Sequence, residues 1–334
     1  QLLHTLKGHM AEVNHLAFSP DGLVLASGST DEGVMLWDSS SGQFLGRLEG
    51  NQAGGELLAL SPDGASLASG SGVELQLRRV SDGAPTGRLE GHADWVRAVA
   101  YSPDGTTLAS GSDDQTVRLW STGDGRLLHT LADHDAPVWS VAFSPDGAIL
   151  ASGDDDWMVR LWRVSDGELL MELDEHMGRV SALAFSPDGT MLASGADDGL
   201  VKLWRVSDWE FGTLLGPDDA VWSLVFSPDS VLLASGPADG MARLWRVADR
   251  TSLGTLDEHD DFGLALAFSP DGSLLATAGA NGVVQLWHTA DRVLLASLHG
   301  HRAGVGSLAF SPDGLLLISG SYDGTVRLWG VTGE

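Results

Sequence analysis

Residues 138–173 read VWSVAFSPDGAILASGDDDWMVRLWRVSDGELLMEL, and this stretch decides the fold. The apolar run 138–143 ends at Ser144-Pro145-Asp146-Gly147, where Pro and Gly stand at positions that a β-turn favours. Three more short runs follow at 149–152, 159–162 and 169–173, and turn residues separate them. The stretch therefore predicts four short antiparallel strands, which is typical of one β-propeller blade.

The Ser-Pro-Asp turn recurs along the whole chain, with its Ser at 19, 61, 102, 144, 186, 227, 269 and 311, at intervals of 41 or 42 residues. Eight such units account for residues 1–334 and leave no linker or second domain. We therefore predict an all-β protein that forms a single eight-bladed β-propeller with four antiparallel strands per blade.

The two ends of the chain fit together as one blade. Residues 328–334 stop where a fourth strand should begin, and residues 1–6 read like a fourth strand with nothing before it. We expect the N-terminal strand to complete the last blade, because closure removes the open sheet edges of the ring.

Four residue types recur at fixed spacing in these units: a His before the first strand, a Ser or Thr in the second, an Asp in the next turn and a Trp ending the third. This pattern resembles the WD40-repeat family, in its bacterial type, over all 334 residues. The positions are His9, Ser27, Asp31 and Trp37; His92, Ser110, Asp114 and Trp120; His134, Ser152, Asp156 and Trp162; His176, Ser194, Asp198 and Trp204; Ser235, Asp239 and Trp245; His259, Thr277 and Trp287; and His301, Ser319, Asp323 and Trp329.

Units two, six and seven depart from the pattern. The second has Asn51, Gly72 and Arg78 in place of His, Asp and Trp, and the sixth has Pro217 in place of His. The seventh has Asn281 at the turn Asp. The second blade has either lost its internal network by drift or carries a specialised edge that a partner uses.

The resemblance implies that these side chains form a buried hydrogen-bond chain from Asp through His and Ser or Thr to the Trp indole. Such a chain satisfies polar groups that would be costly to leave unpaired. A catalytic triad is needed once, so repetition favours architecture over catalysis. The eleven histidines follow the repeat without a metal-binding motif, and we predict neither a metal nor another cofactor.

The formal net charge is −27, but many of the 46 acidic residues occupy repeated turn positions. Nucleic acid as a partner is excluded by the lack of a basic track. No apolar run is long enough to cross a bilayer, so we expect no membrane partner. The absence of cysteine fits a cytoplasmic protein, and we expect a monomeric propeller.

Residues that break the repeat indicate where a partner binds. In WD40 propellers the loops before the first strand and between the second and third strands open at one end of the channel. We name this end the loop face, and the opposite end, with the Ser-Pro-Asp turns, the turn face. The candidate binding residues on the loop face are Trp95, Arg97, Trp139, Trp157, Arg179, Trp222 and Arg302.

The tryptophans differ in what their positions indicate. We expect Trp95 and Trp157 to be exposed, whereas Trp139 and Trp222 either face solvent or pack between blades. Trp209 belongs to the opposite side or the rim and is expected to pack. The turn face, built of near-identical turns, is expected to offer little that distinguishes one partner from another. Acids on the loop face favour a partner with a basic rim: Asp133, Asp135, Asp218, Asp219, Asp260 and Asp261.

The favoured hypothesis is a non-catalytic scaffold that binds a protein or peptide. Arrays with these turns are commonly the C-terminal parts of signalling kinases or NTPases, and a start at Gln1 suits a segment of a larger signalling protein. The alternative is a structural, engineered or recently amplified propeller with no evolved ligand. An enzyme is a third hypothesis, which a cluster of polar residues in the channel would support.

Overall fold

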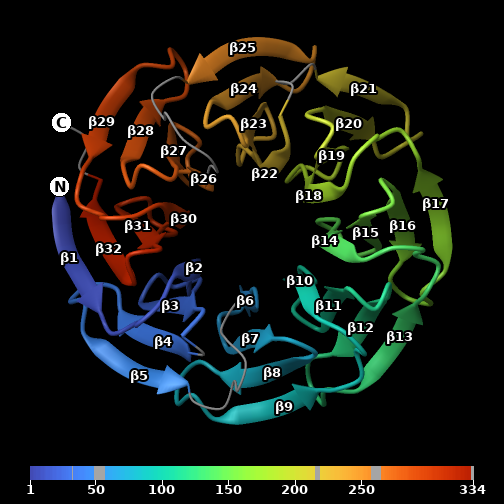
Figure 1. The fold of residues 1–334 in the computed structure, drawn as a ribbon, viewed down its shortest axis with the longest axis horizontal. Coiled ribbons are helices and arrows are strands. Elements are labelled where there is room, and N and C mark those ends of the chain that lie inside the picture. The colour runs from blue at the N-terminus through green and yellow to red at the C-terminus, as the bar shows by residue number, and fades with distance from the viewer. Residues whose placement is uncertain (32, 49–56, 215–218, 257–264, 332–334) are drawn as a thin grey trace.

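A computed structural model describes residues 1–31, 33–48, 57–214, 219–256 and 265–331. These residues form eight four-stranded antiparallel sheets arranged as a ring around a central channel (Figure 1). The prediction of an eight-bladed all-β propeller is confirmed. Nothing in the described ranges forms a helix that is long and apolar enough to span a membrane.

In every blade the first strand lines the channel and the fourth lies at the rim (Figure 1). Blades 1 to 4 comprise β2 (Val13–Phe18), β3 (Val24–Ser29), β4 (Gly33–Asp38) and β5 (Phe44–Leu48); β6 (Leu57–Leu60), β7 (Ser66–Ser71), β8 (Glu74–Arg79) and β9 (Pro85–Leu89); β10 (Val96–Tyr101), β11 (Thr107–Ser112), β12 (Val117–Ser121) and β13 (Leu127–Leu131); and β14 (Val138–Phe143), β15 (Ile149–Asp154), β16 (Val159–Arg163) and β17 (Leu169–Leu173).

The second half of the ring repeats this order, and its last blade takes its fourth strand from the start of the chain. Blades 5 to 8 comprise β18 (Val180–Phe185), β19 (Met191–Ala196), β20 (Val201–Arg205) and β21 (Phe211–Leu214); β22 (Val221–Phe226), β23 (Leu232–Pro237), β24 (Ala242–Arg246) and β25 (Thr251–Leu256); β26 (Ala265–Phe268), β27 (Leu274–Ala278), β28 (Val284–His288) and β29 (Leu294–Leu298); and β30 (Val305–Phe310), β31 (Leu316–Ser321), β32 (Thr325–Gly330) and β1 (Leu2–Lys7).

The ring closes through backbone pairing between the two ends of the chain, as the sequence predicts. β1 pairs with β32 in an antiparallel register that sets Leu6 opposite Val326. The Gln1 amino group donates to the Gly330 carbonyl over 3.0 Å, and the Gly330 N–H donates back to the Gln1 carbonyl over 2.8 Å. The last blade therefore exposes no unpaired third strand.

The Ser-Pro-Asp turns explain many of the acids. In the first, the Ser19 hydroxyl donates to Asp21 over 2.6 Å, and the same carboxylate oxygen accepts the Leu23 N–H over 3.0 Å. These hydrogen bonds, the one from Ser19 above all, lower the pKa of Asp21. Gly22 follows with φ 72°, which glycine adopts without steric cost. These aspartates are turn-forming residues, so the net charge overstates the attraction for basic partners.

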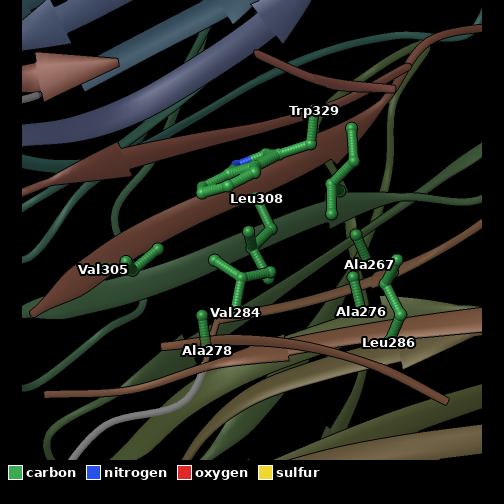
Figure 2. Packing of buried hydrophobic residues seen from close by; sticks show 9 residues of the cluster. Ala267, Ala276, Ala278, Val284, Leu286, Val305, Leu308 and Trp329 are labelled. Carbon is green, nitrogen blue, oxygen red and sulfur yellow. The ribbon is translucent and has the colours of Figure 1, made fainter. Parts of the chain in front are cut away.

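The hydrophobic core lies between neighbouring blades. Between blades 7 and 8, side chains from β26, β27 and β28 pack against side chains from β30, β31 and β32 (Figure 2). Trp329, which ends β32, is 2% exposed and closes this cluster. Burial of each large apolar side chain contributes about 1.5–3 kcal/mol. Such clusters hold the first strands around the channel and fix where the loop-face side chains stand.

Candidate functional site

A chain of hydrogen bonds runs through the interior of blades 1, 3, 4, 5 and 8. In blade 3 the Trp120 indole N–H donates to the Ser110 hydroxyl over 2.8 Å, and this hydroxyl lies 2.7 Å from His92 Nε2. His92 Nδ1 lies 2.9 Å from Asp114. The matching sets are His9, Ser27, Asp31 and Trp37; His176, Ser194, Asp198 and Trp204; and His301, Ser319, Asp323 and Trp329.

In blade 3, burial favours the neutral histidine, whereas hydrogen bonds keep the aspartate charged. Burial lowers the pKa of His92, although the hydrogen bond and charge of Asp114 oppose it. Burial would raise the pKa of Asp114, but hydrogen bonds from Thr116, the Ala93 N–H and His92 outweigh it and lower that pKa to about 2. The Ser110 hydroxyl is fully buried, so a substrate cannot reach it. The arrangement serves to satisfy buried polar groups.

Blade 4 requires a correction, because the prediction that Asp156 belongs to its network is wrong. Asp154, at the end of β15, lies 2.8 Å from His134 Nδ1 and is fully buried. The other Asp154 carboxylate oxygen accepts the N–H groups of Asp156 and Met158, both over 3.0 Å. Asp156 is exposed. In blade 3 the residue that matches Asp154 is Ser112, whose shorter side chain leaves the histidine to Asp114.

Asp154 also brings an ion pair into the interior of blade 4. Arg160, in β16, is buried. Its guanidinium donates one hydrogen bond to Asp154 and another, over 2.9 Å, to Glu172 of β17. The remainder of the network is ordinary, with Ser152 2.8 Å from His134 Nε2 and accepting the Trp162 indole N–H over 2.7 Å.

The units that depart from the repeat keep parts of the network. Arg78 replaces the blade 2 tryptophan, is 7% exposed, and donates to Gln76 over 2.6 Å. Burial lowers the pKa of Arg78. Trp245 donates to Ser235 over 3.2 Å in blade 6, where Asp239 pairs with Arg243, and Trp287 donates to Thr277 over 3.0 Å in blade 7. Asn51, Pro217 and His259 lie outside the described residues.

Three tryptophans on the loop face expose nearly half of their surface. Trp95 precedes β10, Trp157 lies between β15 and β16, and Trp222 is the second residue of β22. Their exposed fractions are 43%, 50% and 46%. For Trp222 this decides between the two alternatives in favour of exposure. Trp209 is half-buried against the core cluster of blades 4 and 5.

Trp139 instead lies within what we name the stacked array: Trp95, Arg97, Trp139 and Arg179. The Arg97 guanidinium is 5.5 Å from the Trp95 ring centroid and 4.9 Å from that of Trp139, and the Arg179 guanidinium lies 4.4 Å from Trp139. Such contacts are worth about 0.5–2 kcal/mol each. Trp139 is half-buried, so packing is its main role.

Two carboxylates neutralise the guanidinium groups of the stacked array. Arg97 Nε donates to Asp113 over 2.9 Å, and Arg179 lies 3.0 Å from Asp197. The positive charges of both arginines are therefore balanced within the stacked array, which does not form a free positive patch.

Trp157 adopts a backbone conformation that bulky residues avoid. Its φ is 71°, and the matching turn position in blades 5 to 8 is glycine: Gly199, Gly240, Gly282 and Gly324. Holding a non-glycine residue there costs about 1–3 kcal/mol. An exposed indole kept in this strained turn suggests a role other than folding.

The remaining predicted loop-face residues are dispersed. Arg302 is exposed, and its backbone N–H donates to Asp323 over 2.8 Å. Asp133 and Asp135 are exposed, and Asp219 accepts the Ala220 N–H over 2.9 Å. Asp218, Asp260 and Asp261 lie outside the described residues. Within the described ranges, no group of three or more acidic or histidine side chains is arranged to hold a metal ion.

The two ends of the ring are both hollowed. On the loop face a cavity of about 560 Å³ lies between blades 6, 7 and 8, and a channel cavity of about 340 Å³ adjoins it at Trp222. On the turn face a cavity of about 620 Å³ lies between blades 5 and 6, beside Arg205, Arg246 and Arg250. Elsewhere on the turn face, in blade 8, Leu315 is 62% exposed. The turn face is thus more varied than its repeated turns suggest.

Comparison with known protein families agrees with the repeat. Residues 1–38, 83–121 and 292–330 match the family described as WD domain, G-beta repeat. These three segments are WD40 repeats. Residues 137–293 also match the family described as IFT122 first beta-propeller.

Curated relatives match a stretch of this chain that is about as long as one unit. Ribosome assembly protein 4 of Saccharomyces cerevisiae is 48% identical over 40 residues, which is 12% of this chain and 8% of that protein. Protein Mut11 of Chlamydomonas reinhardtii is 54% identical over 39 residues, 12% of this chain and 10% of that protein. The Notchless protein homolog of Arabidopsis thaliana is 52% identical over 40 residues, again 12% and 8%. The matched stretch is about a tenth of each relative.

A solved structure resembles the whole ring. The crystal structure of the computationally designed Ika8 protein superposes with a TM-score of 0.89 and 29% sequence identity, over 99% of this chain and 100% of that one. WD40 propellers are generally non-catalytic scaffolds that bind proteins, and this chain has their architecture.

Proposed function

We propose that this WD40 propeller is a non-catalytic scaffold that binds a protein or peptide through its loop face. The observation that carries the proposal is the set of three tryptophans, Trp95, Trp157 and Trp222, each exposed by 43–50% on one face. Exposed tryptophans dominate the binding energy of many protein interfaces. The strained turn at Trp157 adds to this, because strain is retained mostly where it serves function.

The proposed partner is a protein with a basic rim. Arg97 and Arg179 are already paired with Asp113 and Asp197, so they do not attract an acidic partner. Asp133, Asp135 and Asp156 are exposed on the same face. These charges would tune the association rate and its salt dependence more than the affinity. With a net charge of −27, nucleic acid and anionic membranes are disfavoured as partners.

The finer part of the proposal is that the propeller serves as the interaction or sensing part of a larger signalling protein. Its support is the likeness of its Ser-Pro-Asp-Gly and Val-Ser-Asp-Gly turns to those of arrays in such proteins. The alternative is a propeller without an evolved ligand, and the similarity to a designed protein supports that alternative.

Site-directed photo-crosslinking followed by affinity measurement tests the proposal. Benzoylphenylalanine is placed at Ala93, an exposed residue beside Trp95, and in a control protein at Ala148 on the turn face. A partner captured through position 93 is purified, and its dissociation constant is measured by calorimetry. Trp95→Ala and Trp157→Ala should each weaken binding by about 2 kcal/mol. Leu315→Ala, which truncates an exposed apolar side chain on the turn face, should change nothing.

Two results would contradict the proposal. Affinities for the two tryptophan variants that equal the parent's, or a loss confined to Leu315→Ala, would move the site to another surface. A propeller that yields no specific crosslink from either position would favour the alternative without a ligand.

A further inference from the structure

The described residues that line the loop-face cavity between blades 6, 7 and 8 are uncharged. Trp222 of blade 6, Leu266 and Ala280 of blade 7, and Gly306, Leu308 and Tyr322 of blade 8 contribute to its wall. Its volume of about 560 Å³ falls in the range of about 300–1,000 Å³ that is usual for binding cavities.

At two positions of the cavity wall, blades 7 and 8 carry small residues where blade 3 carries large ones. Gly306 occupies the β30 position that is Arg97 in β10 and Trp139 in β14. Ala280 occupies the turn position that holds Asp113 in blade 3 and Asp197 in blade 5. Gly306 of blade 8 and Ala280 of blade 7 are thus small where blade 3 carries the paired Arg97 and Asp113.

Two half-exposed aromatic side chains stand in this wall. Trp222 is 46% exposed and Tyr322 is 48% exposed. The Tyr322 ring lies along the backbone of β30, where a Cβ added to Gly304 or Gly306 would come within 3.1 or 2.8 Å of it. The Tyr322 N–H donates to the Gly304 carbonyl over 2.8 Å, which holds this turn in place. Glycine at 304 and 306 therefore lets the phenol ring lie flat at the cavity.

We propose that this cavity, on the loop face whose role in protein binding is proposed above, receives an uncharged apolar side chain of a partner polypeptide. Leucine and phenylalanine have suitable size. Transfer of a charged side chain against these uncharged residues would be unfavourable unless a partner charge came with it. Transfer of an apolar side chain from water is favourable in proportion to the apolar area that it buries.

The surroundings of the cavity favour basic residues at the flanks of that apolar side chain. Glu12 is exposed and close enough to Tyr322 to add to the rise in the pKa of its phenol, which burial mainly causes. Asp219 stands three residues before Trp222, and Arg302 brings one opposing charge. The chain as a whole carries a net charge of −27. A segment of the form basic–apolar–basic matches this distribution.

Fluorine NMR on the intact chain labelled with 5-fluorotryptophan tests the proposal. The Trp222 resonance is assigned from its disappearance in Trp222→Phe. The probes are the blocked tripeptides acetyl-Lys-Phe-Lys-amide, acetyl-Lys-Ala-Lys-amide, acetyl-Lys-Lys-Lys-amide and acetyl-Glu-Phe-Glu-amide. The first should shift the Trp222 resonance saturably, with a dissociation constant on the order of 1 mM for so small a ligand.

Two alanine substitutions form the matched pair. Ala280→Phe fills the cavity from an exposed position in its wall and should weaken acetyl-Lys-Phe-Lys-amide at least about tenfold, because it removes the apolar burial. Ala93→Phe enlarges an exposed alanine on the loop face of blade 3, outside the cavity, and should leave binding unchanged. The lysine-only and alanine probes should also bind at least about tenfold more weakly. The acidic-flanked probe should bind more weakly at low salt only.

Several results would overturn the proposal. These are the absence of a saturable Trp222 shift, equal binding to Ala280→Phe and the parent, or equal binding of the lysine-only and phenylalanine probes. Equal binding of the two phenylalanine probes at low salt would contradict the preference for basic residues beside the apolar side chain. Failure here is distinct from failure of the proposed function, since that function is tested at Trp95 and Trp157, which do not line this cavity.

Discussion

Blades 3 and 4 build the same interior with different residues. In blade 3 the carboxylate that meets the histidine comes from Asp114, two residues beyond Ser112. In blade 4 it comes from Asp154, which stands at the position of Ser112 itself. What the fold requires is a carboxylate at His Nδ1, and more than one position of the turn can supply it. A residue that the network no longer needs, such as Asp156, is then free to face solvent.

The difference continues into charge and surface. Blade 4 adds Arg160 and Glu172 to its network, whereas the matching Arg118 of blade 3 lies 5.9 Å from the Trp120 ring centroid. The turn of blade 4 exposes Asp155, Asp156 and Trp157 together. In blade 4 a residue that departs from the repeat, Asp154, thus supplies the interior carboxylate, and Asp156, which fits the repeat spacing, adds charge to the loop face.

Removal of the Asp154 carboxylate should have the largest effect. Asp154→Ala leaves His134 without its acceptor and Arg160 buried with half of its pairing, so we expect a loss of about 3–5 kcal/mol in the free energy of unfolding. Chemical denaturation measures it. The matched control is Asp156→Ala, which should cost less than about 0.5 kcal/mol because the side chain is exposed. Equal losses in the two variants would restore Asp156 to the network.

Conversion of blade 4 to the pattern of blade 3 should cost less. Asp154→Ser places the residue of blade 3 there, and Asp156 then stands where Asp114 does. We expect Asp154→Ser to be more stable than Asp154→Ala by about 1–2 kcal/mol, because a hydrogen bond to a charged group is regained. In a double-mutant cycle, Asp156→Ala should now be costly in the Asp154→Ser background. Additive effects would mean that the turn cannot shift its register.

The histidines of both blades should make stability fall with acid. Burial lowers the pKa of His92 and of His134 below the unfolded value of 6.5. Below pH 6.5 the unfolded chain binds protons that the folded chain refuses, so each histidine should reduce stability by up to about 1.4 kcal/mol per pH unit. The free energy of unfolding therefore keeps its full value above pH 6.5 and decreases between pH 6.5 and pH 5.5. Denaturation curves at stepped pH measure the slope.

Variants of the two histidines sharpen this test. His92→Gln and His134→Gln should each reduce the slope of stability against pH by the contribution of one proton. The charged neighbours are Asp114 and Arg118 for His92, and Asp154 and Arg160 for His134. In each pair the aspartate raises and the arginine lowers the pKa of the histidine. A parent protein whose stability does not change between pH 7.5 and 5.5 would show that the histidines take up protons in the fold as readily as in the unfolded chain.

The sequence was sufficient for the architecture. The Ser-Pro-Asp spacing predicts eight blades, and the fragments at residues 1–6 and 328–334 predict the closed ring, because both depend on backbone pairing and turn chemistry that repeat in every unit. The network of blade 3 follows in the same way from the spacing of His92, Ser110 and Asp114.

Details that depend on side-chain reach could not be predicted. In Asp154-Asp155-Asp156 the spacing to Trp162 selects Asp156, and only the loss of serine at 154 hints otherwise. Trp139 and Trp222 occupy the same strand position, yet Arg97 and Arg179 cover the first and not the second. The cavity beside Trp222 depends on small residues in two other blades, and no local pattern reveals that.

The smallest effect should come from the turns themselves, and its sign is the informative part. Trp157 in blade 4 and Gln115 in blade 3 occupy the same turn position, with φ 71° and 68°. Glycine adopts this conformation without steric cost, although it adds flexibility to the unfolded chain, so Trp157→Gly and Gln115→Gly should each raise the free energy of unfolding by about 0.5–1 kcal/mol. Trp157→Ala, which keeps the strain, serves as the matched control and should not stabilise.

If the exposed indole serves binding, Trp157→Gly is the variant that gains stability and loses affinity for the partner. A net loss of stability in Trp157→Gly would mean that the indole contributes packing to the ring, and blade 4 would then differ from blade 3 for structural reasons alone.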